Sequence, residues 1–402
     1  SQNDSDEGRF VASNIFEEKN NNQLDNGSFA ILYRTNAQSR SIEDALRKIN
    51  IDYQVFGGLS FYQRKEIKDV TAYLRLVVNN SDEESLRRVI NFPPRGIGLK
   101  TVEKLLLISE KEKVSMYAVT ALLNKYPKLF NKGLIGRIND FRNLIESLKI
   151  ESQKKDADYI LTNVINRSGI IDFYRNEGSV ESINRIENIE ELRSGINDFI
   201  LEQKELADGD TSISRYLQDI SLYSETDKDL SSDRVSLMTI HMAKGLEFKV
   251  VYVVGIEENL FPSVLSLNTN EDLEEERRLF YVAMTRAKNK LILSHCDFRF
   301  KWGNIVECEP SRFLDEINIE FLEKNNFKED FKPTIENNIS RIRKLRKKGF
   351  INVNKINTIN TSVINIVTND VVEHQRFGIG TVEKVEGDEQ NKKATINFKI
   401  GG

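Results

Sequence analysis

Two short apolar runs within residues 233–296 constrain the fold more strongly than any other part of the sequence. Residues 235–240 and 250–254 are rich in β-branched and aliphatic side chains, which is the pattern of strands buried on both faces. Two such strands so close together in the sequence predict a parallel sheet covered by helices. The turn between them begins with residues 241–245, which are largely polar and follow directly on the first strand.

The charged segment that follows, residues 274–288, predicts a helix. Its first turn holds three glutamates and its last turn holds Arg286 and Lys288, an order that suits the helix dipole at both ends. Arg278 and Arg286 are eight residues apart, so we expect both near one face of this helix. A polar turn after a strand, followed by a helix with arginines, offers the groups that a phosphate site at a sheet edge requires.

Both parts of this segment resemble known helicase motifs. TIHMAKGLEF (residues 239–248) resembles the fifth motif of superfamily 1 DNA helicases of the UvrD/Rep/PcrA type, and EEERRLFYVAMTRAK (residues 274–288) resembles their sixth motif. The order and spacing of the two motifs also match that family. The resemblance implies a RecA-like second motor domain with a large helical insert, called domains 2A and 2B. It also implies an enzyme that couples ATP hydrolysis to 3′-to-5′ movement on single-stranded DNA.

The sequence before this segment predicts a sheet domain that is interrupted by helices. Residues 29–33 read as a strand, 37–49 as a helix and 53–56 as a second strand, which is the start of a doubly wound sheet. Residues 63–78 then form a helix that leads away from the sheet. From residue 79 to residue 228 strand signals vanish and helical leucine and isoleucine spacing dominates. The α/β domain is therefore expected to be discontinuous.

We predict an α/β fold: a RecA-like parallel-sheet domain interrupted by a large all-α insertion, with a small partial β-barrel tail. The predicted parts are motor domain 2A in two pieces (1–70 and 229–322), helical insertion 2B (71–228), a linker (323–369) and a partial Tudor-like module (370–402). The last part alternates short apolar strands with glycine turns and resembles the carboxy-terminal module of PcrA and UvrD. The basic run 341–348 in the linker reads as solvated chain, with a phosphate-contacting tail as the alternative.

The composition narrows the class of protein to which this chain can belong, but it does not identify a substrate. The net charge of −4 permits a local basic groove for nucleic acid while excluding a uniformly basic surface. No apolar run reaches membrane-spanning length and no secretory signal opens the sequence, so we expect a cytoplasmic protein without membrane contacts. Two cysteines and three histidines without ligand spacing predict no metal site, with the cysteines reduced and buried.

The sequence contains no phosphate-binding loop of the type G-x-x-x-x-G-K-[ST]. The segment RGIGLKT (residues 95–101) comes nearest, but Pro93 stands where the first glycine of that loop is required. The Asp-Glu pair that holds magnesium at a strand end is also missing. In the family these elements lie in the first motor domain, so ATP and Mg²⁺ are expected to be held mainly by an upstream domain. Alone, this chain is expected not to hydrolyse ATP.

The motifs place three residues at the nucleotide. Arg286 matches the sixth-motif arginine that reaches the γ-phosphate, where a guanidinium neutralises charge developing in the transition state. Its alternative is an ordinary surface pair with Glu275 or Glu276. Glu247 matches the fifth-motif glutamate near the nucleotide sugar, with a solvated carboxylate as its alternative, and Gly245 would allow close backbone approach. Arg278 either supports this arrangement or pairs with the acidic turn before it.

Five residues outside the insert are candidate contacts to single-stranded DNA. Thr239 and His241 end a predicted strand at the carboxyl edge of the sheet, and the resemblance places them on the DNA backbone. Arg34 and Asn36 follow another strand and resemble a family segment that contacts phosphates; Asn36 has helix capping as its alternative role. Trp302 lies among alternating aromatics and cations (residues 299–304), a base-stacking pattern, and stands where the family has a stacking aromatic. The alternative for Trp302 is a core position.

The insert offers one candidate for duplex DNA. Arg95, Gly96 and Gly98 precede a helix predicted near Lys100, and amides at such a helix start can hold phosphates regardless of base sequence. This stretch resembles the helix-hairpin-helix element of the family, although an ordinary turn between helices has the same pattern. Ser263 stands where the family commonly has histidine, so one DNA contact of the family is not expected here.

These features predict the carboxy-terminal part of an ATP-dependent DNA helicase that acts on single strands and single-strand/duplex junctions in repair or replication. RNA polymerase or repair factors are expected as further partners of the tail. One alternative is the motor part of an AddA- or RecB-type helicase-nuclease, which would continue into a carboxylate-rich nuclease domain. The other is a non-enzymatic module that docks on DNA or RNA polymerase.

Overall fold

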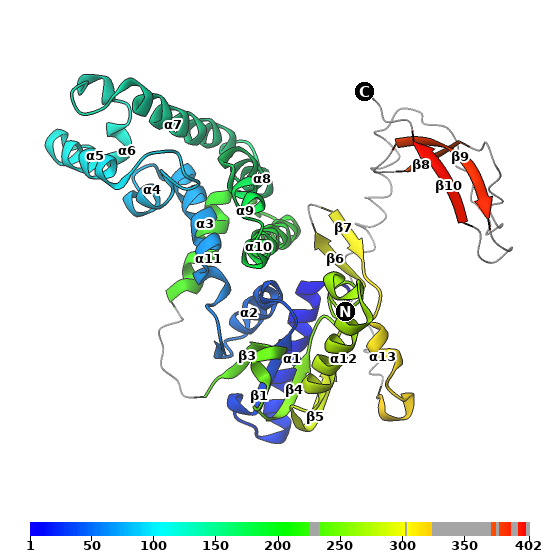
Figure 1. The fold of residues 1–402 in the computed structure, drawn as a ribbon. Helices are drawn as coiled ribbons and strands as arrows, with labels where there is room; N and C mark the ends of the chain where they lie inside the picture. Colours follow the sequence, from blue (N-terminus) through cyan, green and yellow to red (C-terminus); the bar gives the residue numbers. More distant parts are fainter. Residues whose placement is uncertain (226–232, 302–303, 324–370, 375–377, 387–392, 399–402) are drawn as a thin grey trace. The chain divides into compact units, whose positions relative to one another are not determined.

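A computed structural model describes residues 1–225, 233–301, 304–323, 371–374, 378–386 and 393–398 of the chain (Figure 1). The chain separates into two compact units, Ser1–Glu323 and Lys324–Gly402. Trp302 and the basic run 341–348 lie outside the described residues, as does the predicted linker after residue 323. Among the described residues, no helix is long and apolar enough to cross a membrane.

The first unit is built on a five-stranded sheet with the order β2-β3-β1-β4-β5 (Figure 1). The strands are β1 (Phe29–Tyr33), β2 (Tyr53–Val55), β3 (Val235–Thr239), β4 (Phe248–Val253) and β5 (Ala287–Leu293). Every neighbouring pair is parallel, which confirms the predicted α/β fold. Strand β1 lies between β3 and β4, so the strands on either side of the helical insertion interleave in one sheet.

Helices cover both faces of this sheet. Helices α1 (Asp4–Asn22) and α2 (Ser39–Lys48) pack on one face, where the core includes Val11, Ile15, Ile31, Ile42 and Leu46. Helix α12 (Asn270–Met284) and the short helix η6 (Ile240–Ala243) cover the other face, with Met238, Leu279, Phe280 and Ala283 in its core. Burial on both faces is why the central strands read as continuous apolar runs rather than alternating ones.

The predicted helix over residues 274–288 is wrong at both ends. Helix α12 begins four residues earlier, because the side chain of Thr269 accepts a hydrogen bond from the backbone of Asp272 and caps it. It ends at Met284. Residues 287–293 form the edge strand β5, in which Lys288, Asn289 and Lys290 are exposed. Arg286 therefore lies in the turn between helix and strand, not on a helical face with Arg278. An edge strand lacks the apolar run that marks its buried neighbours, so the strand signal was weak.

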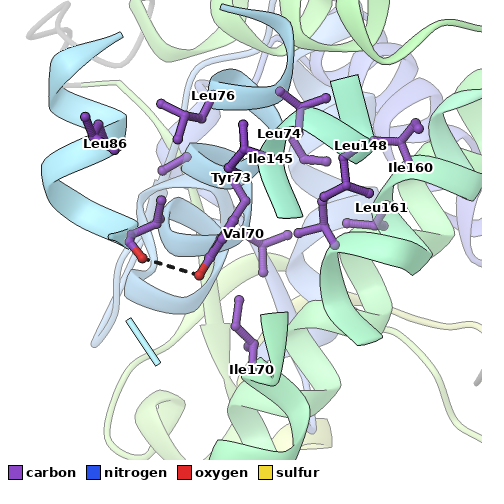
Figure 2. Close-up of a cluster of buried hydrophobic side chains, with 14 of the residues drawn as sticks. Val70, Tyr73, Leu74, Leu76, Leu86, Ile145, Leu148, Ile160, Leu161 and Ile170 are labelled. Carbon is purple, nitrogen blue, oxygen red and sulfur yellow. Dashed lines mark hydrogen bonds between the residues drawn. The ribbon is translucent and has the colours of Figure 1, made fainter. Parts of the chain in front are cut away.

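From α3 onward, the described residues of the insertion up to Glu225 form helices and connecting turns, without a strand. Its helices are α3 (Lys65–Val78), α4 (Glu83–Val89), α5 (Leu99–Glu112), α6 (Met116–Val119), α7 (Lys132–Ser152), α8 (Ala157–Ser168), α9 (Ile170–Glu177), α10 (Val180–Glu205) and α11 (Ile213–Glu225). Their apolar faces form a core of their own, in which Tyr73 lies among aliphatic side chains such as Val70, Leu148 and Ile170 (Figure 2). The hydroxyl of Tyr73 donates to the Phe92 carbonyl at 2.6 Å, and the Val89 carbonyl oxygen lies 3.3 Å from the same hydroxyl oxygen.

Charged side chains join helix α10 of the insertion to α1 and α2. The Arg40 side chain is 3% exposed and pairs with four carboxylates. The four partners are Asp4 at 3.0 Å, Asp44 at 3.3 Å, Glu191 at 2.7 Å and Asp198 at 3.1 Å. Gly195 leaves room for this guanidinium, since a Cβ there would lie 2.9 Å from Arg40 Nη1. One buried cation thus holds two helical layers together.

The remaining elements are two antiparallel groups and a short helix. Strands β6 (Phe298–Lys301) and β7 (Asn304–Glu307) form a hairpin, followed by α13 (Arg312–Asp315). In the second unit, β8 (Val371–His374), β9 (Gly378–Glu386) and β10 (Lys393–Phe398) form a sheet of order β10-β9-β8. These strands agree with the β character predicted for the tail, while a Tudor-like barrel stays a prediction.

Candidate nucleotide and nucleic-acid sites

The sequence-predicted residues gather at the two opposite ends of the parallel strands. Arg286 and Glu247 directly precede β5 and β4, whose first residues Ala287 and Phe248 are paired in register. Arg34 and His241 follow β1 and β3, whose last residues Tyr33 and Thr239 are also paired in register. The nucleotide candidates therefore share the amino end of the sheet, and the candidates for single-stranded DNA share its carboxyl end.

Arg286 connects the two helicase-like motifs directly. Its Nη1 donates to the Leu246 carbonyl at 3.0 Å and its Nε donates to the Val282 carbonyl at 3.0 Å. The backbone N–H of Phe248 in turn donates to the Arg286 carbonyl at 2.9 Å. Residues on both sides of Glu247 are thus bonded to Arg286, so the fifth-motif carboxylate and the sixth-motif guanidinium are held as neighbours.

The positive charge of the Arg286 guanidinium is not neutralised by a carboxylate among the described residues. Its three hydrogen bonds go to two carbonyls and to Thr285 Oγ1, all neutral groups. In the part of the chain that the structure describes, it forms no ion pair with a carboxylate. The pair with Glu275 or Glu276 considered as its alternative is not formed, because Arg278 pairs with Glu275 and Arg34 with Glu276. Of five N–H donors in an arginine, two stay available for a phosphate.

Glu247 and Gly245 lie beside Arg286 on an open surface. The Glu247 side chain is 56% exposed, with Lys288 Nζ 3.5 Å from its carboxylate. It lies in the turn before β4 rather than in a helix. Gly245 has a φ of +88°, a backbone conformation that favours glycine, and nothing lies within 4 Å of where its Cβ would be. A ligand could therefore approach this backbone closely while the carboxylate accepts hydrogen bonds from hydroxyl groups.

At the carboxyl end, His241 and Asn36 are exposed and Thr239 is half-buried. Partial burial and the nearby Arg34 guanidinium hold the pKa of His241 below its ordinary value, which favours the neutral imidazole. The capping role considered for Asn36 is wrong: Asn36 is the first residue of the short helix η2 (Asn36–Gln38), and Thr35 precedes it in the cap position. The Asn36 amide is left to face solvent.

Arg34 is held by a carboxylate on helix α12. Its Nη2 lies 2.7 Å from Glu276 Oε1, and its Nε donates to both carboxylate oxygens at 3.1 Å. The Arg34 side chain is 21% exposed and that of Glu276 is 6% exposed. The bridge uses one edge of the guanidinium, and Nη1 forms no hydrogen bond with the residues described. This second edge is the part that could contact a phosphate.

In the insertion, the Arg95 side chain packs against the core, whereas Gly96 and Gly98, predicted with it as a phosphate site, are exposed. The Arg95 guanidinium donates to the carbonyls of Val89, Pro93 and Ser168 at 3.1 to 3.2 Å and packs over the Tyr73 and Phe141 rings. Its side chain therefore braces the insertion core. Gly96 has a φ of +69°, and Gly98 is exposed and precedes α5. Any phosphate cradle here consists of the exposed amides at the start of α5.

Two buried groups escaped the sequence-based reasoning. Arg299 belongs to the cation-aromatic pattern around Trp302, yet it is buried, with Glu257 at 2.7 Å and Glu7 at 2.9 Å. It anchors the base of the β6–β7 hairpin and is not a nucleic-acid contact. Glu276 was considered only as a surface partner, although it precedes Leu279, Phe280 and Ala283 of the apolar helix face by three, four and seven residues. That spacing was a signal that it is buried.

Comparison with known proteins bears on the family of this chain. The family model for the UvrD-like helicase C-terminal domain matches residues 1–297. The chain is similar to DNA helicase II of Haemophilus influenzae, with 35% identity over 404 residues, which is 100% of this chain and 53% of the relative. It is also similar to the ATP-dependent DNA helicase PcrA of Staphylococcus aureus, with 34% identity over 399 residues, 99% of this chain and 53% of the relative. The chain thus spans about half the length of these curated relatives and matches their carboxy-terminal half. The match over most of the chain shows that it belongs to the UvrD-like helicase C-terminal domain family.

Proposed function

We propose that this chain is the carboxy-terminal motor part of an ATP-dependent DNA helicase that moves 3′-to-5′ on single-stranded DNA. The observation that carries the proposal is the placement of Arg286, which lies beside Glu247 at one end of the sheet and, among the described residues, donates hydrogen bonds only to neutral groups. A cation without an acidic partner at an open surface suits a phosphate that is presented by another domain. The helicase names of the relatives support the same conclusion.

In this proposal the nucleotide lies between this chain and a domain that carries the phosphate-binding loop. That domain would make most of the contacts to ATP and Mg²⁺. Arg286 would reach the γ-phosphate with its two remaining N–H groups, and Glu247 would accept hydrogen bonds from the sugar hydroxyls beside Gly245. ATP bound there supplies the phosphoryl-transfer chemistry, and the residues of this chain orient it and neutralise charge. The chain alone is proposed to lack ATP hydrolysis.

Single-stranded DNA is proposed to cross the carboxyl end of the sheet. Thr239, His241, Asn36 and the outer edge of Arg34 would contact the backbone, and Trp302 would stack on a base. The amides of Gly98 and its neighbours at the start of α5 would hold duplex phosphates at a junction without reading base sequence. A role in DNA repair or replication in the cytoplasm, with repair factors or RNA polymerase as partners of the tail, completes the proposal.

The decisive experiment replaces Arg286 in the intact helicase. Arg286→Ala should lower DNA-stimulated ATP turnover by about 10³-fold or more, the effect expected when a γ-phosphate arginine is removed. Single-strand binding, measured by fluorescence anisotropy, should stay near the wild-type value because the DNA edge is at the other end of the strands. Arg278→Ala is the matched control, since Arg278 belongs to the same motif and pairs with exposed Glu275. Wild-type turnover in Arg286→Ala would refute the assignment.

A further inference from the structure

Glu276 is a buried carboxylate on the apolar face of α12. The residue is 5% exposed, whereas the neighbouring Glu274 and Glu275 are exposed and pair with arginines on their own helix. A charge on an apolar helix face is costly unless it is paired and fully hydrogen-bonded. The buried Glu276 carboxylate is therefore explained by the hydrogen-bond donors that it binds at the edge of the sheet.

The Glu276 carboxylate joins three segments that are distant in the sequence. From the end of β1, Arg34 donates to both of its oxygens. From the turn before α12, Ser266 Oγ donates at 3.2 Å and the Ser263 backbone N–H at 3.4 Å. The helix, the strand end and the turn are thus held at one point. That point is beside the proposed path of single-stranded DNA, because α12 packs against η6, the short helix that contains His241, and β1 and β3 end in register there.

The other end of the same helix leads to the proposed nucleotide site. Helix α12 continues from Glu276 to Met284, about 12 Å at 1.5 Å per residue, and Arg286 follows two residues later. Over this length Leu279, Phe280 and Ala283 are packed into the core under the sheet. A helix packed at native density moves as a unit rather than deforming. A displacement at Arg286 is therefore transmitted to Glu276, and through it to Arg34.

We propose that Glu276 is a positioning residue that couples the nucleotide end of α12 to the DNA edge of the sheet. The inference rests on the proposed function. Glu276 contacts neither nucleotide nor DNA in this arrangement; it acts through Arg34 and through the turn of Ser263 and Ser266. Neutralising Glu276 keeps its shape but removes the ion pair, so movement of the helix no longer carries the strand end with it.

The test measures ATP consumed per nucleotide travelled by the intact helicase on single-stranded DNA. Glu276→Gln should raise this ratio about tenfold, within the usual range of coupling free energies between two sites. Glu275→Gln is the matched control, because it removes the adjacent but exposed carboxylate, and its ratio should equal that of the wild type. An unchanged ratio in a folded Glu276→Gln protein would overturn the proposal, since a purely structural role would alter only the melting temperature.

A second variant covers the case in which Glu276→Gln fails to fold. Ser266→Ala removes one hydrogen bond to the carboxylate and leaves the ion pair intact. It should raise the ratio about threefold, as expected for the loss of one hydrogen bond. An unaltered ratio in Ser266→Ala overturns the proposal in that case. A wild-type protein that neither hydrolyses ATP nor moves on DNA would instead refute the proposed function, so the two failures are distinguishable.

Discussion

Replacing Arg40 by methionine should be among the most destabilising single substitutions in this protein. Arg40 pairs with Asp4, Asp44, Glu191 and Asp198. Of these four carboxylates, Asp44 also pairs with a second arginine, Arg47, at 3.1 Å. Methionine retains much of the aliphatic volume but removes the guanidinium that all four carboxylates share. Burial already disfavours their charge: it raises the pKa of Glu191 to about 7, against the lowering effect of Arg40. Without Arg40 that opposing effect is lost.

The expected loss follows from the burial of the pair. Breaking a buried ion pair by removing one partner costs about 3–5 kcal/mol, because the remaining charge is buried without compensation. The side chain of Arg40 is 3% exposed and those of its partners are 8% to 25% exposed, so solvent screens this cluster little. A domain is commonly stable by about 5–15 kcal/mol. The substitution should thus remove a large share of the free energy of unfolding.

Urea unfolding of the complete chain, followed by circular dichroism, measures this effect. Arg9→Met is the matched control: Arg9 and Asp6 are 3.7 Å apart with side chains 57% and 41% exposed, and such pairs contribute about 0–1 kcal/mol. Adding Glu191→Gln to Arg40→Met should recover part of the loss, because one uncompensated carboxylate is removed. A loss below about 1 kcal/mol for Arg40→Met would refute the reasoning, since it would place this cluster among exposed pairs.

Two further results are expected. Burial raises the pKa of Glu191 to about 7 and of Asp198 to about 6, from 4.5 and 3.8, so the folded state binds protons more tightly than the unfolded state. The contribution of these two carboxyl groups to the free energy of unfolding should therefore be largest at pH values below 3.8 and 4.5 and should decline as the pH rises to about 7. Urea unfolding of the wild type and of a Glu191→Gln/Asp198→Asn variant across this pH range checks the direction of the change. A stability advantage of the wild type that grows with pH would contradict the prediction. Arg95→Met should cost about 1–3 kcal/mol in the same assay, because it removes the donor to the Pro93 and Ser168 carbonyls. Junction-DNA binding by this variant should be unchanged, and a large loss of binding in a stably folded protein would return Arg95 to the interface.

Local sequence determined the secondary structure of the sheet core and the family. Strand β1 was predicted with the bounds that the structure has, residues 29–33, because a strand buried on both faces is a local apolar run. The helicase-like motifs are local too, so residues 239–248 and 274–288 led to the family that the comparisons show. The long helical insertion was recognisable for the same reason, since helical periodicity needs only neighbouring residues.

Tertiary structure alone decided the partners of the charged side chains. Arg34, Arg95 and Arg299 are all plausible phosphate ligands in sequence, yet one is bridged by Glu276, one donates to core carbonyls and one is buried between Glu7 and Glu257. Arg286 differs because its contacts are neutral. The long arginine side chain can pair with groups that are distant in the sequence but close in the folded chain. Arg34 and Glu276 are 242 residues apart in the chain and Arg299 and Glu7 are 292 apart, so sequence spacing could not reveal these pairs and only the tertiary fold brings them together.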